Sequence, residues 1–215
     1  MKHNTKPIYL FSISSHPDAI SINSLDITFF KPEIDFSEYD YLIITSKQAS
    51  KALEQYDKEL YIDKPALCIS QQSAKSFEAL GGTVLDIGKG YGDTLVDSIK
   101  RYSKEKRFLY LRAKEIASDF VEQSRKISYK IDEAIVYESK CSQAIQNVKV
   151  EENATLIFTS PSSVKCFLQK NDFTAQQTII VIGKTTAKAL PNYITPVISP
   201  KTTIQSCIDL VQKYQ

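Results

Sequence analysis

The sequence predicts an α/β fold of two similar lobes, each built on a mainly parallel sheet flanked by helices. The main observation is a repeat of apolar strand, hydroxyl residues and helix, in which Thr45-Ser46 aligns with Thr159-Ser160. A second pair of similar segments follows the first pair. The repeated segments are residues 40–53 with 154–167, and residues 67–77 with 180–190. The copies lie about half a chain apart, far beyond the roughly 20–50 residues of solenoid repeats, so two lobes are expected rather than an array.

Strands alternate with helices along most of the chain, which is the order that produces βαβ units and parallel sheets. The apolar run 41–45 is typical of a strand covered on both faces, and Ser46 is a good N-cap for the helix that follows. Gly81 and Gly82 end the next helix. In chain order, we expect strands over residues 8–14, 25–30, 41–45, 66–69, 84–87, 107–111, 155–159, 178–182 and 195–198. We expect helices over residues 17–22, 48–56, 72–80, 95–102, 117–127, 162–169, 185–190 and 202–213.

The two copies differ in their number of strands, which predicts the domain organisation. The first copy has four βα units from Tyr41 to about Ile131, whereas the second, from Thr155 onwards, has about three. We expect the strands 8–14 and 25–30 to complete the second sheet, so that this lobe is discontinuous and the chain crosses twice. The expected division is 1–34 with 142–215 for lobe 1, 39–131 for lobe 2, and 35–38 with 132–141 for the linker strands.

Composition is that of an ordinary globular protein, with 215 residues, 42% of them hydrophobic and 24% charged. The net charge is +2, the lysines are scattered and arginine is rare, so no nucleic-acid partner is expected. No segment has the ~20 apolar residues of a membrane span, and the N-terminus does not have the pattern of a signal peptide. We therefore predict a cytoplasmic protein with no membrane partner.

The four cysteines are far apart in sequence, and the only histidines are His3 and His16. No CxxC pair exists, so no metal site is expected. Cys68 falls in a strand, and Cys166 and Cys207 fall on apolar helix faces. Their expected role is that of small core side chains in a reducing cytoplasm.

Hydroxyl side chains collect where strands end and helices begin. Thr45 and Ser46 follow one strand and Ser70 the next, and Ser160, Ser162, Ser163, Thr185 and Thr186 occupy the matching places in the second copy. Helix capping explains some of them. Helix N-termini flanked by hydroxyls also receive carboxylates or phosphates. Both interpretations stand, and four such termini would suit a ligand with many carboxylates.

Three further features have a structural and a functional interpretation each. Gly88, Gly90 and Gly92 form a turn that either needs positive φ angles or offers backbone N–H groups to an anion. It is neither a dinucleotide fingerprint nor a P-loop. His16 has no evident partner in sequence. Tyr137 is either a packed aromatic of the return linker whose hydroxyl is exposed to solvent, or a functional phenol.

Taken together, these features resemble the uroporphyrinogen-III synthase family. The resemblance covers essentially the whole chain in order, and the second-half segments Phe-Thr-Ser-Pro-Ser-Ser and Ile-Gly-Lys-Thr-Thr-Ala are its most specific part. One departure is Ser-Ser-His-Pro at 14–17, where many members carry Arg-Pro, so a cationic contact is lost or passed to His16. The matching segments are residues 42–46, 92–95, 110–112, 136–139, 158–164, 182–190 and 199–203.

The resemblance implies two α/β lobes joined by a two-stranded linker, and a reaction. Hydroxymethylbilane, a linear tetrapyrrole, would close to uroporphyrinogen III with loss of water and inversion of ring D through a spiro intermediate. Tyr137 matches the family's linker tyrosine, proposed to assist departure of the hydroxyl. The predicted substrate contacts are Thr45, Ser46, Ser70, Gly90, Arg112, Ser160, Ser162, Ser163, Thr185 and Thr186, with no metal and no cofactor.

The remaining expectations concern partners and rival functions. We expect a monomer whose ligand is the tetrapyrrole, with a possible transient contact to the preceding pathway enzyme. One rival is a two-lobed binding protein for a polycarboxylate, which would leave only the spontaneous type I product. The other is a nucleotide-dependent Rossmann-type enzyme, against which the missing fingerprint argues.

Overall fold

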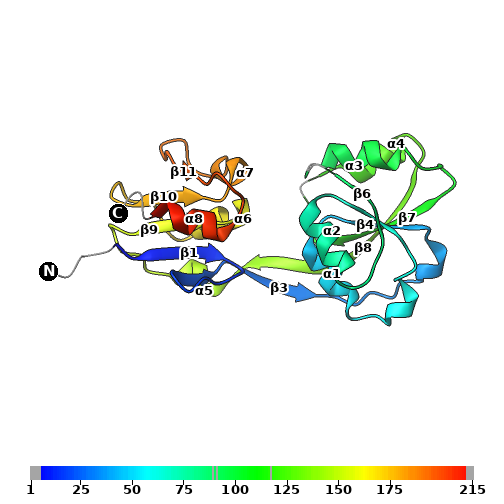
Figure 1. Ribbon diagram of the computed structural model, residues 1–215, viewed down its shortest axis with the longest axis horizontal. Helices are drawn as coiled ribbons and strands as arrows, with labels where there is room; N and C mark the ends of the chain where they lie inside the picture. The colour runs from blue at the N-terminus through cyan, green and yellow to red at the C-terminus, as the bar shows by residue number, and fades with distance from the viewer. Residues whose placement is uncertain (1–5, 89, 91, 117, 212–215) are drawn as a thin grey trace. The chain divides into compact units, whose positions relative to one another are not determined.

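The computed structural model describes residues 6–88, 90, 92–116 and 118–211 of the chain. Contacts divide the chain into two units (Figure 1). Unit 1 comprises Met1–Asp26 and Lys140–Gln215, and unit 2 comprises Ile27–Ser139. Unit 1 is therefore discontinuous in sequence, and each unit has its own sheet.

Unit 2 contains a six-stranded sheet with helices on both faces. Its strands, in spatial order, are β3 (Leu25–Phe29), β8 (Lys130–Cys141), β7 (Arg107–Ala113), β4 (Tyr41–Ile44), β5 (Ala66–Cys68) and β6 (Val84–Ile87). Its helices are α1 (Lys47–Leu53), α2 (Gln71–Glu78), α3 (Gly92–Ile99) and α4 (Phe120–Lys126), with 3-10 turns at Phe36–Glu38 and Lys58–Leu60. The strands from β8 to β6 all pair in parallel.

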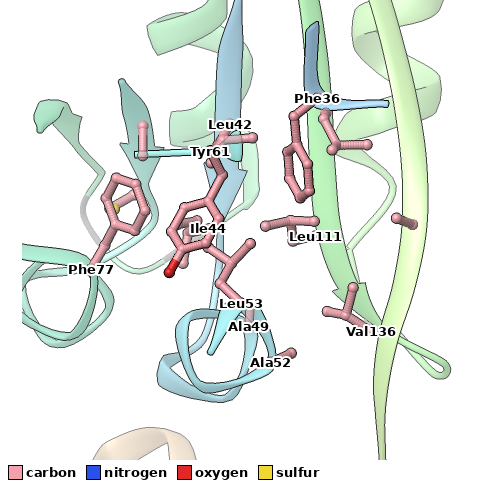
Figure 2. Close-up of a cluster of buried hydrophobic side chains, with 14 of the residues drawn as sticks. Phe36, Leu42, Ile44, Ala49, Ala52, Leu53, Tyr61, Phe77, Leu111 and Val136 are labelled. Atoms are coloured by element: carbon pink, nitrogen blue, oxygen red, sulfur yellow. The ribbon is translucent and has the colours of Figure 1, made fainter. Parts of the chain in front are cut away.

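Side chains of β4 alternate between two buried clusters, which is why the strand reads as a continuous apolar run. Leu42 and Ile44 pack against α1 and α2 through residues such as Leu53 and Phe77 (Figure 2). Ile43 points to the other face, where it packs with side chains of α3 and α4. Because successive strand residues face opposite ways, a strand buried on both faces has no polar positions.

Unit 1 contains a five-stranded parallel sheet. Its strands, in spatial order, are β11 (Val197–Ile198), β10 (Thr178–Val181), β9 (Thr155–Phe158), β1 (Ile8–Ser12) and β2 (Ile20–Asn23). Its helices are α5 (Gln143–Asn147), α6 (Pro161–Phe167), α7 (Lys184–Ala187) and α8 (Ile204–Val211). Phe11 stacks on Phe158 in the cluster that α5, α6 and α7 cover, whereas Leu10 faces α8.

The two units share one strand order. In unit 2 the order β8-β7-β4-β5-β6 corresponds to β2-β1-β9-β10-β11 in unit 1. The sequence repeat places β4 with β9 and β5 with β10, and the topology agrees with that pairing. Unit 1 therefore uses its two N-terminal strands in the positions that unit 2 fills with its last two. The predicted fold class, α/β with mainly parallel sheets flanked by helices, is confirmed.

The N-terminal region differs from the prediction in one element. The helix expected over 17–22 is wrong, because Ile20–Asn23 is strand β2 and pairs with β1. Ile20 and Ile22 alternate with Ser21 and Asn23, which is the period of a strand at a sheet edge. The segment expected to complete the unit 1 sheet, residues 25–30, instead pairs beside β8 in unit 2, where Phe30 N–H donates to the Val136 carbonyl at 2.9 Å.

The crossings between units also come at other residues than expected. The chain passes from one unit to the other at 26/27, within β3, and at 139/140, within β8. The expected linker 35–38 contains Phe36, which is buried in the unit 2 core. The expected linker strand 132–141 pairs with β7 as far as Tyr137. The crossing strands are thus sheet members for most of their length.

One cysteine differs from the prediction that it is reduced. Cys141 and Cys166 form a disulfide with Cα atoms 5.3 Å apart, linking the end of β8 to α6. The expectation of a reduced core Cys166 is therefore wrong, because the fold brings together two residues that are 25 apart in sequence. Cys68 and Cys207 are buried and free.

Candidate functional site

A pocket of about 390 Å³ opens at the carboxyl edge of the unit 2 sheet. Because β4, β5, β6 and β7 are parallel, the residues that follow them meet at one edge. The pocket lining comes from β7 and β8, from residues that follow β4, β5 and β6, and from the segment that leads into α4. The lining residues are Thr45, Ser46, Ile69, Gly90, Tyr110, Ala113, Glu115, Ile116, Ser118, Phe120 and Tyr137.

Two buried tyrosines line the pocket together with the dipeptide that follows β4. The Tyr110 hydroxyl lies 3.0 Å from Thr45 Oγ1. Tyr137 and Ser46 both line the pocket, and no hydrogen bond of the Tyr137 hydroxyl is made within the part of the chain that the structure describes. Both tyrosines are nearly inaccessible, at 3% and 8% exposed. The dipeptide and the two phenols therefore place four hydroxyl groups on one pocket.

Burial determines the protonation of both phenols. It raises the pKa of Tyr137 above its ordinary value, and the nearby Ser46 hydroxyl acts in the other direction. The pKa of Tyr110 is raised for the same reason, with the hydrogen bond between Tyr110 and Thr45 opposing and the neighbouring Tyr137 adding to the shift. Both groups are therefore protonated at neutral pH and can donate a proton or a hydrogen bond.

The Ser46 hydroxyl has a second task at the start of α1. Its Oγ accepts from the Gln48 N–H at 3.1 Å as the N-cap of the helix. The cap uses this oxygen as an acceptor and leaves its own hydrogen unused. The Tyr137 hydroxyl has no hydrogen-bond partner among the described residues, so its hydrogen is available to the pocket.

The glycine turn is used structurally at Gly88 and Gly90. Gly90 has φ of +87°, and its N–H donates to the Ile69 carbonyl at 2.8 Å. The Gly88 N–H donates to the Cys68 carbonyl at 2.7 Å, and a Cβ at Gly88 would come within 2.8 Å of Thr94 Oγ1. Neither amide is free for an anion, so the anion-cradle interpretation is wrong for Gly88 and Gly90. Gly90 still lines the pocket.

Two other predicted residues of unit 2 are outside this pocket. Ser70 caps α2 in a reciprocal capping box with Ser73. Arg112 lines a neighbouring pocket, pairs with Glu133 at 2.7 Å, and donates to the carbonyls of Ala113 and Lys114. Its charge is thus already paired within unit 2.

The matching edge of unit 1 carries the serine turn. Ser160 and Ser163 form a reciprocal capping box at α6, and the Ser163 hydroxyl also donates to the Ser160 carbonyl at 2.7 Å. Ser163 is completely buried, so its hydroxyl serves the cap and leaves no hydrogen for a ligand. Ser162, one residue earlier, is exposed. The structure therefore separates a structural serine pair from an available serine.

The threonine pair of unit 1 does not cap α7. The N-cap is Gly183, which has no side chain to offer, so the capping interpretation of Thr185 and Thr186 is wrong. Thr185 is exposed, and Thr186 is buried. Among the described residues, the Thr186 hydroxyl has no hydrogen-bond partner. His16, after β1, contacts Gln205 Oε1 at 3.1 Å and accepts from the Asp18 N–H at 3.3 Å.

Sequence reasoning missed Tyr110, Glu115 and Ser118 as pocket residues. Tyr110 carried a signal: it is the only hydroxyl within an apolar strand segment, two residues before Arg112 on the same face of β7. Glu115 and Ser118 belong to an irregular segment whose position depends on the fold. In the part of the chain that the structure describes, no cluster of His, Cys, Asp or Glu could hold a metal ion, and no helix is long and apolar enough to cross a membrane.

Comparison with known proteins identifies the family. The family model for uroporphyrinogen-III synthase HemD matches residues 18–209. Uroporphyrinogen-III synthetase from Helicobacter pylori 26695 is 26% identical, with a TM-score of 0.81 over 98% of this chain and 100% of that one. A mutant uroporphyrinogen III synthase from the extremely thermophilic bacterium Thermus thermophilus shares the fold at 11% identity, with a TM-score of 0.65 over 97% and 100% of the two chains. No curated protein sequence matches significantly. The chain therefore belongs to the uroporphyrinogen-III synthase family, the cyclising hydro-lyases of heme biosynthesis.

Proposed function

We propose that this chain closes hydroxymethylbilane to uroporphyrinogen III, with Tyr137 as the acid that protonates the departing hydroxyl. The observation that supports this assignment is a buried, protonated phenol in a pocket of unit 2 whose hydroxyl has no hydrogen-bond partner among the described residues. A phenol held in this way presents its hydrogen to a substrate atom in the pocket. The reaction needs one such donor, because its leaving group is a hydroxyl.

The proton and electron balance assigns a limited task to the protein. A pyrrole nitrogen supplies the electron pair that expels the hydroxyl as water, with the proton from Tyr137, and an azafulvene forms. Attack by the substituted carbon of ring D gives the spiro intermediate, which rearranges and closes. The ring proton lost on closure restores the phenol. Holding the flexible chain for this attack is catalysis by positioning, with general acid help.

The pocket lining favours the pyrrole that carries the leaving hydroxyl over a carboxylate side chain of the substrate. Ile69, Ala113 and Phe120 provide apolar surface for a ring. Neither Lys nor Arg is among the described lining residues, and Glu115 adds a carboxylate. A carboxylate there would lack a cationic partner, which is costly in a partly buried site. The azafulvene is electron-poor, so a carboxylate nearby favours its formation.

The substrate's carboxylates need other partners, and we propose the hydroxyl edge of unit 1 for some of them. Ser160, Ser162, Thr185 and Thr186 follow β9 and β10, whose carboxyl ends lie at one sheet edge. The available Ser162 and the uncommitted Thr186 hydroxyl support this assignment. Hydrogen bonds to a charged acceptor are worth about 1.5–3 kcal/mol each.

The test is the isomer of the product. Purified protein is incubated with hydroxymethylbilane, and the porphyrins formed after oxidation are separated. Predominant isomer III supports the proposal. Only isomer I, at the rate seen without protein, would identify a polycarboxylate-binding protein without activity. A parallel sample dialysed against EDTA tests the cofactor-free prediction, and a nucleotide requirement would favour the Rossmann-type alternative.

Partners and location form a further part of the proposal. We infer a monomer that acts in the cytoplasm and takes the unstable tetrapyrrole through a transient contact with the enzyme that makes it. The family's pathway supports this location, whereas the Cys141–Cys166 disulfide is unusual in a reducing compartment. Fractionation of cells shows whether the protein is in the cytoplasm. Titration of free thiols in the fresh extract shows whether Cys141 and Cys166 are oxidised there.

A further inference from the structure

We propose that Tyr110 is a positioning residue for the cyclisation: its phenol holds Thr45 so that the Thr45 hydroxyl becomes a second donor to the leaving group. This inference rests on the proposed function of the unit 2 pocket. Tyr110, Thr45 and Tyr137 all line that pocket, and they come from three neighbouring strands or strand ends. The pocket then holds two donors, Tyr137 and the Thr45 hydroxyl that Tyr110 holds.

The argument begins with a count of hydrogens. The Thr45 and Tyr110 hydroxyls have one hydrogen each, and the 3.0 Å contact between their oxygens uses one of them. Neither hydroxyl has another hydrogen-bond partner among the described residues. Both side chains are part of the pocket wall. One hydrogen of the pair is therefore available to a group that enters the pocket.

The identity of that hydrogen follows from the acidity of the two groups. A phenol is a far stronger acid than an aliphatic alcohol, and is therefore the better donor in a bond between them. Tyr110 then donates to Thr45 Oγ1, and the Thr45 hydrogen is the free one. Tyr110 is almost fully buried and packs edge-on against Phe120 at 4.9 Å between ring centroids, which fixes the direction of its hydroxyl.

The acceptor is the departing hydroxyl rather than a substrate carboxylate. No described cation lines the pocket and Glu115 does, so a carboxylate is a poor guest. A neutral hydroxyl that gains negative charge as it leaves is a suitable acceptor for two donors. An interaction that strengthens as the bond breaks lowers the barrier without tightening substrate binding. The effect should therefore appear in kcat and not in KM.

The test compares Tyr110→Phe, Thr45→Val and the double variant with a matched control. We expect Tyr110→Phe to lower kcat about two- to tenfold, the range for one neutral hydrogen bond, with KM unchanged and isomer III retained. Thr45→Val should lose at least as much, and adding Tyr110→Phe to it should cost nothing more. Thr45→Ser, which keeps the hydroxyl, should recover most of what Thr45→Val loses.

The matched control is Tyr129→Phe. Tyr129 is a buried tyrosine of the same cluster, its hydroxyl donates to the Tyr102 carbonyl at 3.3 Å, and it is not among the pocket residues. This variant should keep the wild-type kcat. Equal losses in Tyr110→Phe and Tyr129→Phe, additive losses in the double variant, or a raised KM with unchanged kcat would each overturn the positioning role. Wild-type protein without isomer III would instead refute the proposed function itself.

Discussion

Hydroxyl groups at the strand ends fall into two kinds at the scale of single residues. Those of Ser73 and Ser163 are buried and complete capping boxes, so their hydrogen bonds hold helices in place. Those of Thr45, Tyr137 and Thr186 retain a hydrogen that no cap uses. Residue type alone does not distinguish the two kinds, because both are small polar side chains after a strand. Only the second kind can contribute directly to chemistry.

Tyr137→Phe should slow cyclisation strongly without changing the isomer. The substitution keeps the ring and its packing but removes the donor. General acid help is worth about 10²–10⁴-fold, and the low end is expected because the pyrrole nitrogen already expels the hydroxyl. Rates of isomer III formation in wild type and variant check this. Full activity would remove Tyr137 from the mechanism, and a change to isomer I would show that it steers ring D.

Thr186→Val should reduce turnover while the fold survives. The variant keeps the shape of the side chain and removes a hydroxyl with no partner among the described residues. Loss of one hydrogen bond to a carboxylate predicts a decrease of about ten- to hundredfold. Thr186→Ser is the control, because it restores the hydroxyl. If Thr186→Val has wild-type turnover per folded molecule, Thr186 only packs in the protein and does not bind substrate.

The serine turn allows stability and binding to be separated at the scale of one element. Ser160→Ala removes the N-cap of α6 and should lower the free energy of unfolding by about 1 kcal/mol. Ser162→Ala changes an exposed side chain of the same turn and should leave stability unchanged, while turnover falls. Urea unfolding and steady-state rates measure the two effects. Loss of stability in Ser162→Ala would mean that it, too, belongs to the cap.

The disulfide ties the end of β8, which belongs to unit 1, to α6 across 25 residues of chain. Closing a loop of that length restricts the unfolded chain, so reduction should cost about 2–4 kcal/mol of stability. Unfolding with and without dithiothreitol measures this. The double variant Cys141→Ala and Cys166→Ala should have the stability of the reduced protein, both with and without dithiothreitol. A reductant effect that persists in the double variant would have to come from elsewhere in the protein.

At the scale of the whole molecule, buried thiol and phenol groups predict a loss of stability in alkali. Burial raises the pKa of Cys68 to about 12, and the pKa values of Tyr110 and Tyr137 are also raised. The unfolded chain releases these protons first, with pKa values of about 8.5 for Cys and about 10 for Tyr. Their contribution is therefore complete below the unfolded values and is lost as pH rises towards about 12.

The measurement is the urea midpoint at a series of pH values from neutral upwards. It should fall progressively once the pH passes the ordinary pKa of cysteine. Cys68→Ala should show a shallower fall than wild type, although its packing makes it less stable at every pH. A midpoint that is independent of pH across this window would contradict the buried, neutral state of these groups.

Much of the fold could be predicted because its signals are local. The repeated strand, hydroxyl and helix segments are visible in sequence, and both Ser46 and Ser160 begin their helices as the pattern indicates. Counting strands predicted that N-terminal strands complete the second sheet, correctly for residues 8–14 and wrongly for residues 25–30, whose expected place is taken by Ile20–Asn23. The helix expected over 17–22 failed because four residues of an edge strand at Ile20–Asn23 offer little pattern to weigh against a short helix.

The sequence by itself determined the α/β class, the repeat and the hydroxyl-rich strand ends, since each depends on residues that are close together in the chain. Only the tertiary structure decided which hydroxyls are committed to caps, that Arg112 is paired with Glu133, and that Cys141 meets Cys166. It also brought Tyr110 to Thr45, 65 residues away. Such contacts depend on sheet order and on the direction of side chains from different strands, which no local pattern encodes.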